Sequence, residues 1–432
     1  MKKRAVLKEK KYSHFDSRVK ATAFERYVNS PEKIAQHSFL PLIHFTRKDV
    51  KYTKAGGRNP KLRDLCYVSH KDAFVFQWYS DLLNKRYNSR VKKDGTNNCI
   101  IAYRNNKPGK FNAHFAKDVF DFIRKDSCYI IVGDFTSFFD NLNHQHLKKM
   151  VCSLLEVEKL PSDYWAILRN VMKYSWFELD DLLELNGLEK HREINKLQTV
   201  LPINVFREHK HKYLKKNRKD YGIPQGTPIS AALSNIYMLG FDKQLNDLIT
   251  SNKGIYRRYS DDFIIVLPSI IDVKAFWSQI DNIIKSVPRL ELQEKKTNMF
   301  FFEGENILNC NSSLFPEILN SKNELEYLGF AFNGKHISIR EKTISKFYYR
   351  AYKRVDGIRL REAGIVDGNA DYYTLYQKYT HLGKSTKGKG RGNFLTYVDR
   401  CISIFGEEEK VHIVRKKHWG KIQNRLKTPI KK

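Results

Sequence analysis

Two apolar segments that end or begin with carboxylates constrain this chain more than any other feature. The stretch GIYRRYSDDFIIVLP (254–268) places Asp261 and Asp262 just before an apolar run, and CYIIVGDF (128–135) ends a second run with Asp134. Such runs predict buried strands, and IYRRY predicts the partner strand of a hairpin. Ser-Asp-Asp could be only a turn, since aspartate is common in turns. Asp134 lacks that explanation, because a charge at the end of a buried strand is costly without a partner.

The three carboxylates together predict a metal site. If the two strands are neighbours in one sheet, Asp134 and Asp261, 127 positions apart (261 − 134), point to the same place. Three oxygen ligands without nearby His or Cys suit Mg²⁺ or Mn²⁺. Two such ions about 3.5–4 Å apart can stabilise the attacking and leaving oxygens of a displacement at phosphorus. The ions would also offset the repulsion between Asp261 and Asp262, and a triphosphate substrate would add further ligands.

Charge indicates the partner. The chain has 78 Lys and Arg against 47 Asp and Glu, a formal net charge of +31. Such an excess repels itself and is most easily understood if a polyanion lies along the surface, so nucleic acid is the expected partner. A merely solubilising surface is the alternative. No uninterrupted apolar span approaches about 20 residues, so no membrane association is expected.

The cysteines and the first residues predict a cytoplasmic location. Six cysteines are scattered without a C-x-x-C pair, and the basic start lacks an apolar segment. The first feature predicts reduced thiols and argues against a zinc site. The second argues against a secretory signal.

Two later segments have clear local patterns. GIPQGTPISAALSNIYM (222–238) predicts a loop that enters a helix, with Thr227 as N-cap and Pro228 at the first helical position. LEYLGFAFNGKHISIR (325–340) predicts a hairpin with Asn333-Gly334 at its turn. The basic, glycine-rich stretch 383–392 is expected to be a flexible loop.

Five segments follow the order of the palm motifs of reverse transcriptases: VGDFTSFFDNLNH, GIPQGTPISAALSNIYM, YSDDF, EKKTNMF and LEYLGFAFNG. Over about residues 60–345 the chain resembles these enzymes, most of all those of bacterial group II introns, retrons and antiviral defence systems. The resemblance implies an α+β fold of right-hand architecture and an RNA-directed DNA polymerase. It also implies Mg²⁺ or Mn²⁺ as cofactor, an RNA template, dNTP substrates and a DNA product.

The resemblance assigns roles to individual residues. Asp134, Asp261 and Asp262 become metal ligands. Phe139 matches the aromatic gate that blocks a ribose 2′-hydroxyl, although a core position beside Phe138 is the alternative.

Other matched residues would contact substrate. Gln225 and Gly226 match the turn beside the nascent base pair, and Tyr259 of the YSDDF motif belongs to the same substrate-binding group. Lys296 matches the lysine that neutralises or protonates the leaving pyrophosphate. Arg63, with Lys61 as a weaker candidate, matches a finger residue that holds the triphosphate, although in so basic a chain both could be solvated surface charges.

The same resemblance divides the chain into four regions. These are a basic N-terminal extension (1–60), fingers (61–127), a palm with an insertion near 156–220 (128–335), and a helical thumb with a basic C-terminal extension (336–432). Within the palm, Asp140 is expected to cap the following helix rather than bind metal. His144 and His146 are expected on the surface of that helix.

The sequence departs from two of the three similar groups. The longer maturase region of intron enzymes and the Val-Thr-Gly element of retron enzymes are missing. The chain looks more like the stand-alone defence-associated enzymes, which implies an antiviral role and, as in some members, a structured noncoding RNA template. The alternatives are a template-independent DNA polymerase of the same fold and a non-catalytic RNA-binding protein. The three intact aspartates argue against the latter.

Overall fold

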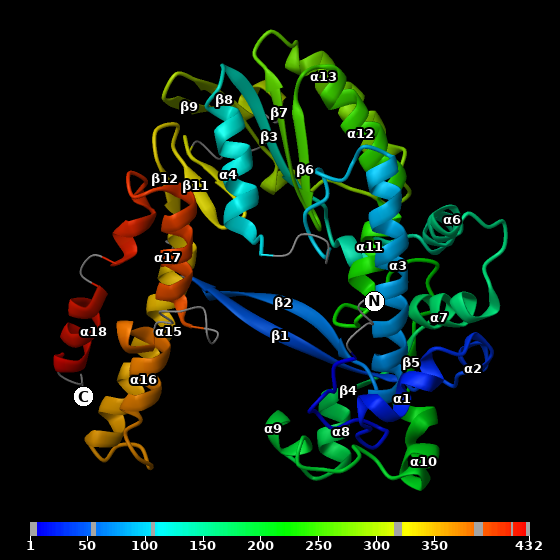
Figure 1. Cartoon of the computed structure of the whole chain (residues 1–432). Helices are drawn as coiled ribbons and strands as arrows, with labels where there is room; N and C mark the ends of the chain where they lie inside the picture. Colours follow the sequence, from blue (N-terminus) through cyan, green and yellow to red (C-terminus); the bar gives the residue numbers. More distant parts are fainter. Residues whose placement is uncertain are drawn as a thin grey trace.

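The computed structural model describes residues 7–52, 58–104, 109–314, 322–383, 392–415 and 418–428, with the backbone alone for 49–52 and 58–61. It is an α+β structure with three sheets. In Figure 1 the largest sheet lies at the top, a second sheet crosses the middle, and the C-terminal helices stand at the left. The predicted loop at 383–392 falls almost wholly outside the described residues, as does the side chain of Lys61.

The largest sheet carries the predicted carboxylates. Its five antiparallel strands run in the order β6-β7-β3-β8-β9. Their bounds are Cys128–Asp134 (β3), Ile255–Tyr259 (β6), Asp262–Pro268 (β7), Asn298–Glu303 (β8) and Asn306–Asn309 (β9). The condition on which the metal-site prediction depends is met: the two aspartate-bearing strands are neighbours, because β3 pairs with β7 over its whole length.

Both faces of this sheet are covered, which explains the continuous apolar run in β7. Phe263, Ile265 and Leu267 pack into one core, whereas Ile264 and Val266 pack into another. Strands buried on both faces do not alternate between polar and apolar residues.

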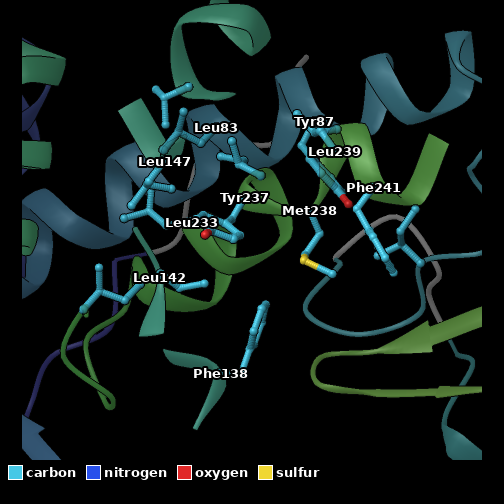
Figure 2. Close-up of a cluster of buried hydrophobic side chains, with 14 of the residues drawn as sticks. Leu83, Tyr87, Phe138, Leu142, Leu147, Leu233, Tyr237, Met238, Leu239 and Phe241 are labelled. Carbon is cyan, nitrogen blue, oxygen red and sulfur yellow. The ribbon is translucent and has the colours of Figure 1, made fainter. Parts of the chain in front are cut away.

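The first core lies against helices, and part of it appears in Figure 2. The helices in contact there include α3 (His70–Lys93), α6 (His144–Leu155), α11 (Ser230–Tyr237), α12 (Leu239–Ser251) and α13 (Val273–Lys285). The second core lies against α4 (Asn112–Ile123), α17 (Phe394–Phe405) and a small sheet of β10 (Leu325–Tyr327), β11 (Phe330–Phe332) and β12 (Ile337–Ile339). The β11–β12 turn contains Asn333 and Gly334, as predicted.

The middle sheet combines strands from distant parts of the sequence. Its order is β2-β1-β4-β5, with bounds Leu42–Tyr52 (β1), Arg58–Tyr67 (β2), Ser175–Glu178 (β4) and Lys215–Lys216 (β5). β4 runs parallel to β1. The segment predicted as a palm insertion therefore extends the sheet of the N-terminal strands.

Short helices from the inserted segment share a core with this middle sheet. They are α8 (Leu179–Leu185), α9 (His191–Ile194) and α10 (Ile203–Tyr213). Three other helices, α1 (Ala21–Val28), α2 (Pro31–Ala35) and α7 (Ser162–Met172), belong to the first core. α1 packs on α3 and α2 on α7, and α8 covers β1 and β4. The N-terminal segment is thus part of the first core.

The C-terminal region is largely helical. α15 (Glu341–Glu362) packs with α16 (Tyr372–Tyr379) and α18 (His418–Lys427) around a small core of their own. α17 and the 3₁₀ turn η3 (Lys410–Arg415) instead pack against α4 and β12. Among the described residues, no helix is long and apolar enough to cross a membrane.

Candidate active site

The three aspartates meet where β3 ends and the β6–β7 hairpin turns. Asp134 lies opposite Asp262 in the β3–β7 ladder, and Asp261 lies in the turn just before β7. The Phe135 N–H donates a hydrogen bond to the Asp261 carbonyl at 3.3 Å, which ties the turn to the end of β3. Asp134 is buried, Asp261 is half-buried and Asp262 is exposed.

The charges at this point are incompletely balanced. Burial raises the pKa of Asp261, and repulsion from Asp134 raises it further. Loss of hydration, followed by repulsion from Asp261 and Asp134, raises the pKa of Asp262 to about 6, although Lys296 and Arg340 oppose the shift. The site therefore favours added positive charge.

Lys296 supplies part of that charge. It lies in the 3₁₀ turn η1 (Glu294–Lys296), and its ammonium group contacts Oδ2 of Asp134. The other oxygen of Asp134, Oδ1, is buried and has no hydrogen-bond partner.

These residues fit a divalent metal ion. Within the described part of the chain, no three His, Cys, Asp or Glu side chains already form a complete metal centre. An unpartnered buried carboxylate oxygen beside two further carboxylates nevertheless offers the oxygen donors that Mg²⁺ and Mn²⁺ prefer.

A cavity of about 1010 Å³ opens beside the carboxylates. Asp134, Asp262, Tyr259 and Lys296 line it, so the structure brings these four predicted residues together. Its other walls come from the segments 101–104 and 110–112, from 326–329 at the small sheet, and from single residues that include Arg340.

Several polar residues of this cavity were not predicted. They include Tyr103, Arg104, Lys295 and Arg340. Arg340 Nη1 lies 3.4 Å from Glu326 Oε2, which holds the guanidinium at the cavity wall. Lys295 lies in the EKKTNMF segment quoted above, but no role was assigned to it. Sequence patterns do not show which residues share a wall, because the walls come from chain segments that are far apart.

A second group of predicted residues lies around the loop before α11. The Ile223 N–H donates to the Phe139 carbonyl at 3.0 Å, and the Gln225 carbonyl accepts from the Cys66 N–H of β2 at 2.8 Å. Gly226 has a φ of 104°, and a Cβ there would lie 2.7 Å from the Cys66 carbonyl oxygen. This loop therefore joins the segment around Phe139 to β2 of the middle sheet.

Phe139 and Arg63 occupy different surroundings. Phe139 is half-buried, packs against the first core and contacts the Phe138 ring edge-on. Both interpretations of Phe139 thus stay open, since a half-buried ring can also face a ligand. Arg63 is exposed on β2 opposite Arg47, and it is not among the residues that line the cavity.

Three further predictions from the sequence, on Asp140, His144 and His146, are wrong. The helix after Asp140 is capped by Asn143, whose side chain accepts from the His146 N–H, whereas Asp140 accepts from the Gln225 amide at 3.3 Å. His144 is buried and His146 half-buried, because their rings contact the Gly222 and Tyr237 carbonyls.

The helix predicted to begin at Pro228 in fact begins at Ser230, with Ile229 as N-cap. The Thr227 hydroxyl still accepts from the Ser230 N–H at 3.3 Å. Residues 227–229 therefore form a hydrogen-bonded turn before the helix. Their sequence is typical of the first turn of a helix, but the helix begins only after them.

Comparison with known proteins gives a family match. The profile of the family described as "Reverse transcriptase (RNA-dependent DNA polymerase)" matches residues 82–332, which is more than half of the chain. A search of the curated proteins found no significant match.

Solved telomerase structures are also similar. Apo telomerase from Candida tropicalis is 12% identical with a TM-score of 0.42, over 97% of this chain and 68% of that chain. The same telomerase truncated from its C-terminal domain is also 12% identical with a TM-score of 0.42, over 75% of this chain and 61% of that chain. Telomerase from Candida albicans in complex with a TWJ fragment of telomeric RNA is 11% identical with a TM-score of 0.39, over 94% and 64%. This chain spans 61–68% of the length of these telomerase chains.

Proposed function

Because this chain belongs to the reverse transcriptase (RNA-dependent DNA polymerase) family, we propose that it copies an RNA template into DNA from dNTPs. The observation that carries the proposal is the meeting of Asp134 and Asp262 across the β3–β7 ladder, with Asp261 in the adjoining turn and a large cavity alongside. Asp134 and Asp262 thus supply oxygen donors to the cavity that they line, where we expect the end of a nucleic acid to bind.

In this proposal Asp134, Asp261 and Asp262 hold Mg²⁺, or Mn²⁺ in its place. The bound ions would supply charge stabilisation for an in-line displacement at the nucleotide α-phosphorus. Lys296, already beside Asp134, would neutralise or protonate the leaving pyrophosphate. Tyr259, on the cavity wall, would contact the nucleic acid end.

The loop before α11 would position the incoming nucleotide. Gln225 and Gly226 would lie beside the nascent base pair, and the Phe139 ring would exclude a ribose 2′-hydroxyl. Arg63 would reach the triphosphate from the middle sheet. These roles follow the family motifs, and each one can be tested by substitution.

A dNTP-incorporation assay tests the function directly. The wild-type protein should incorporate dNTPs with an RNA template. The double variant Asp261→Ala, Asp262→Ala should not incorporate dNTPs but should still bind RNA, because removing negative charge cannot weaken attraction to a polyanion. Incorporation without template would instead favour a template-independent polymerase. Polymerisation at nearly the wild-type rate in the double variant would refute the two-metal site.

We further propose that the enzyme acts in the cytoplasm of bacteria in antiviral defence and uses a dedicated structured noncoding RNA. The support is the motif resemblance to stand-alone defence enzymes together with basic segments outside the carboxylate site, such as 207–219, which has seven Lys or Arg and one Glu. Crosslinking and sequencing of bound RNA from cells should recover one RNA far above its abundance. A spectrum of transcripts weighted by abundance would contradict a dedicated RNA.

The defence role needs its own assay. Cells that express the wild-type protein with its native flanking DNA should resist phage infection, and cells with the Asp261→Ala, Asp262→Ala variant should not. Equal phage plating on both would argue against defence by DNA synthesis.

A further inference from the structure

A buried ion pair lies directly behind the turn that carries Asp261 and Asp262. Arg258 of β6 is fully buried, and its partner Asp242 of α12 is 1% exposed. Arg258 Nε and Nη2 donate to the two carboxylate oxygens of Asp242 at 2.8 and 2.6 Å, and the Tyr256 hydroxyl donates to the same carboxylate at 2.8 Å. Because two buried charges are costly to desolvate, apolar residues of the same volume would serve packing equally well. The pair therefore requires another explanation.

The third guanidinium nitrogen of Arg258, Nη1, binds the turn that carries Asp261 and Asp262. Nη1 donates to the Ser260 carbonyl at 2.8 Å. Ser260 has a φ of 63°, a left-handed conformation that is uncommon outside glycine, Asn and Asp. On the other side of Asp261, its own carbonyl accepts from the Phe135 N–H. The peptide groups on both sides of Asp261 are thus fixed, one by Arg258 and the other by the residue that follows Asp134.

The same network reaches the cavity wall. The Arg258 N–H donates to the Cys99 carbonyl at 2.7 Å, and the Arg258 carbonyl accepts from the Ile101 N–H at 2.9 Å. The Asn235 amide donates to the Ala102 carbonyl at 3.0 Å, and its oxygen lies 3.4 Å from Arg258 Nη1. The backbone of Arg258 therefore holds the wall segment directly, and its guanidinium is linked to the same segment through Asn235.

We propose that Arg258 and Asp242 are positioning residues, which fix the Ser260–Asp262 turn so that Asp261 and Asp262 face Asp134 in the arrangement that binds a divalent ion. Asp242 holds the guanidinium in one orientation, and the guanidinium holds the Ser260 carbonyl. An apolar pair could fill the same space but could not donate to that carbonyl. The inference rests on the proposed polymerase function.

Arg258→Lys tests this role, because lysine keeps the charge but loses the planar fork. Mn²⁺ binding, followed by electron paramagnetic resonance without nucleotide, should weaken about tenfold or more, the range found when residues that orient metal ligands are changed. The kcat for dNTP incorporation should fall by about tenfold or more, with KM for dNTP within about twofold, because the turn acts on the reacting atoms. Tyr256→Phe, which removes one hydrogen bond to Asp242, should shift both quantities in the same direction by about two- to fivefold.

Asp72→Asn is the matched control. Asp72 is also buried and accepts from His37 at 2.8 Å, but it lies at the start of α3. This variant should lower the thermal unfolding temperature without changing Mn²⁺ affinity or kcat. If Arg258→Lys behaves like this control, the positioning role is wrong. If Arg258→Lys does not fold, unchanged Mn²⁺ affinity and kcat in Tyr256→Phe would likewise exclude the positioning role. Wild-type protein that binds Mn²⁺ but incorporates no dNTP would refute the polymerase function instead.

Discussion

At the scale of single residues, Asp134 shows how this site combines burial with charge. One of its oxygens contacts the Lys296 ammonium and the other is buried without a partner. An unpaired buried carboxylate oxygen costs stability, and a bound cation would remove that cost. We therefore expect Mn²⁺ to raise the thermal unfolding temperature of the wild-type protein more than that of Asp134→Asn, measured by circular dichroism. An equal rise in both proteins would show that the ion binds elsewhere.

Phe139 allows a test of sugar selectivity. If its ring lies against the ribose C2′ position, Phe139→Val should raise the use of ribonucleotides relative to deoxynucleotides by about tenfold, which corresponds to about 1.4 kcal/mol. The ratio of kcat/KM for the two nucleotide types checks this. Phe138→Val, in the buried neighbour, is the control and should lower stability with an unchanged ratio. An unchanged ratio in Phe139→Val would make Phe139 a core residue only.

Gly226 should tolerate no side chain. Gly226→Ala introduces a Cβ that meets the Cys66 carbonyl in a backbone conformation with positive φ, so we expect a loss of about 1–3 kcal/mol in the free energy of unfolding. Gly368→Ala is the control, because Gly368 has a similar φ of 102° but an added Cβ there would meet only the Arg361 side chain, at 3.5 Å or more. Chemical denaturation of both variants separates the collision from the backbone strain. Equal losses would mean that the contact with Cys66 is unimportant.

At the scale of elements, strands with their own apolar pattern could be predicted, and strands defined by their partners could not. β3 and β7 are buried on both faces, so their runs are visible in the sequence. β4 and β5 have four and two residues and exist through pairing with β1 and with each other.

The same distinction separates the predicted from the unpredicted parts of the site. The three aspartates follow strong local patterns, whereas Arg258 looks like any basic residue in IYRRY. Its burial depends on Asp242, which belongs to another element. Tertiary contacts of this kind have no local signal.

The segment before α1 makes stability depend on pH. Burial lowers the pKa of His14 to about 4, against an ordinary value near 6.5. Its neighbours act in both directions, since Asp16 raises this pKa and His70 lowers it. The unfolded chain therefore binds a proton more readily, so stability is lost as pH falls from about 6.5 to about 4, by up to about 3 kcal/mol.

Urea denaturation from pH 7 to pH 4.5 measures this dependence. The wild-type free energy of unfolding should fall more steeply than that of His14→Gln, which has no group to titrate at this position. Other buried histidines, such as His144 and His418, are common to both proteins. Parallel pH profiles would show that His14 is not responsible.

At the scale of the whole molecule, the net charge of +31 predicts salt-dependent RNA binding. α10 has no buried residues, so Lys212→Glu with Lys216→Glu in β5 should leave the fold intact. Each lost phosphate contact should lower the slope of log affinity against log salt by about 0.7–0.9. Filter binding at several salt concentrations checks the change.

The control for this experiment is a second double variant that changes the total charge by the same amount. Lys243 and Lys285 each pair with an aspartate one turn away on their own helix, so Lys243→Glu with Lys285→Glu should leave the slope nearly unchanged. If both double variants lower the slope alike, the effect belongs to overall charge rather than to a surface at 207–219.

The interleaved order of the middle sheet also has a consequence for how the protein is made. β1 ends at Tyr52, but its parallel partner β4 begins at Ser175, and β3 of the largest sheet lies between them in the sequence. During synthesis, one edge of β1 stays unpaired until β4 leaves the ribosome. Both edges of β3 stay unpaired until β7 and β8 have been made. Such distant pairings fold slowly and leave strand edges exposed. Neither sheet can therefore be completed by an early domain of the nascent chain: the middle sheet needs β5, which ends at Lys216, and the largest sheet needs β9, which ends at Asn309.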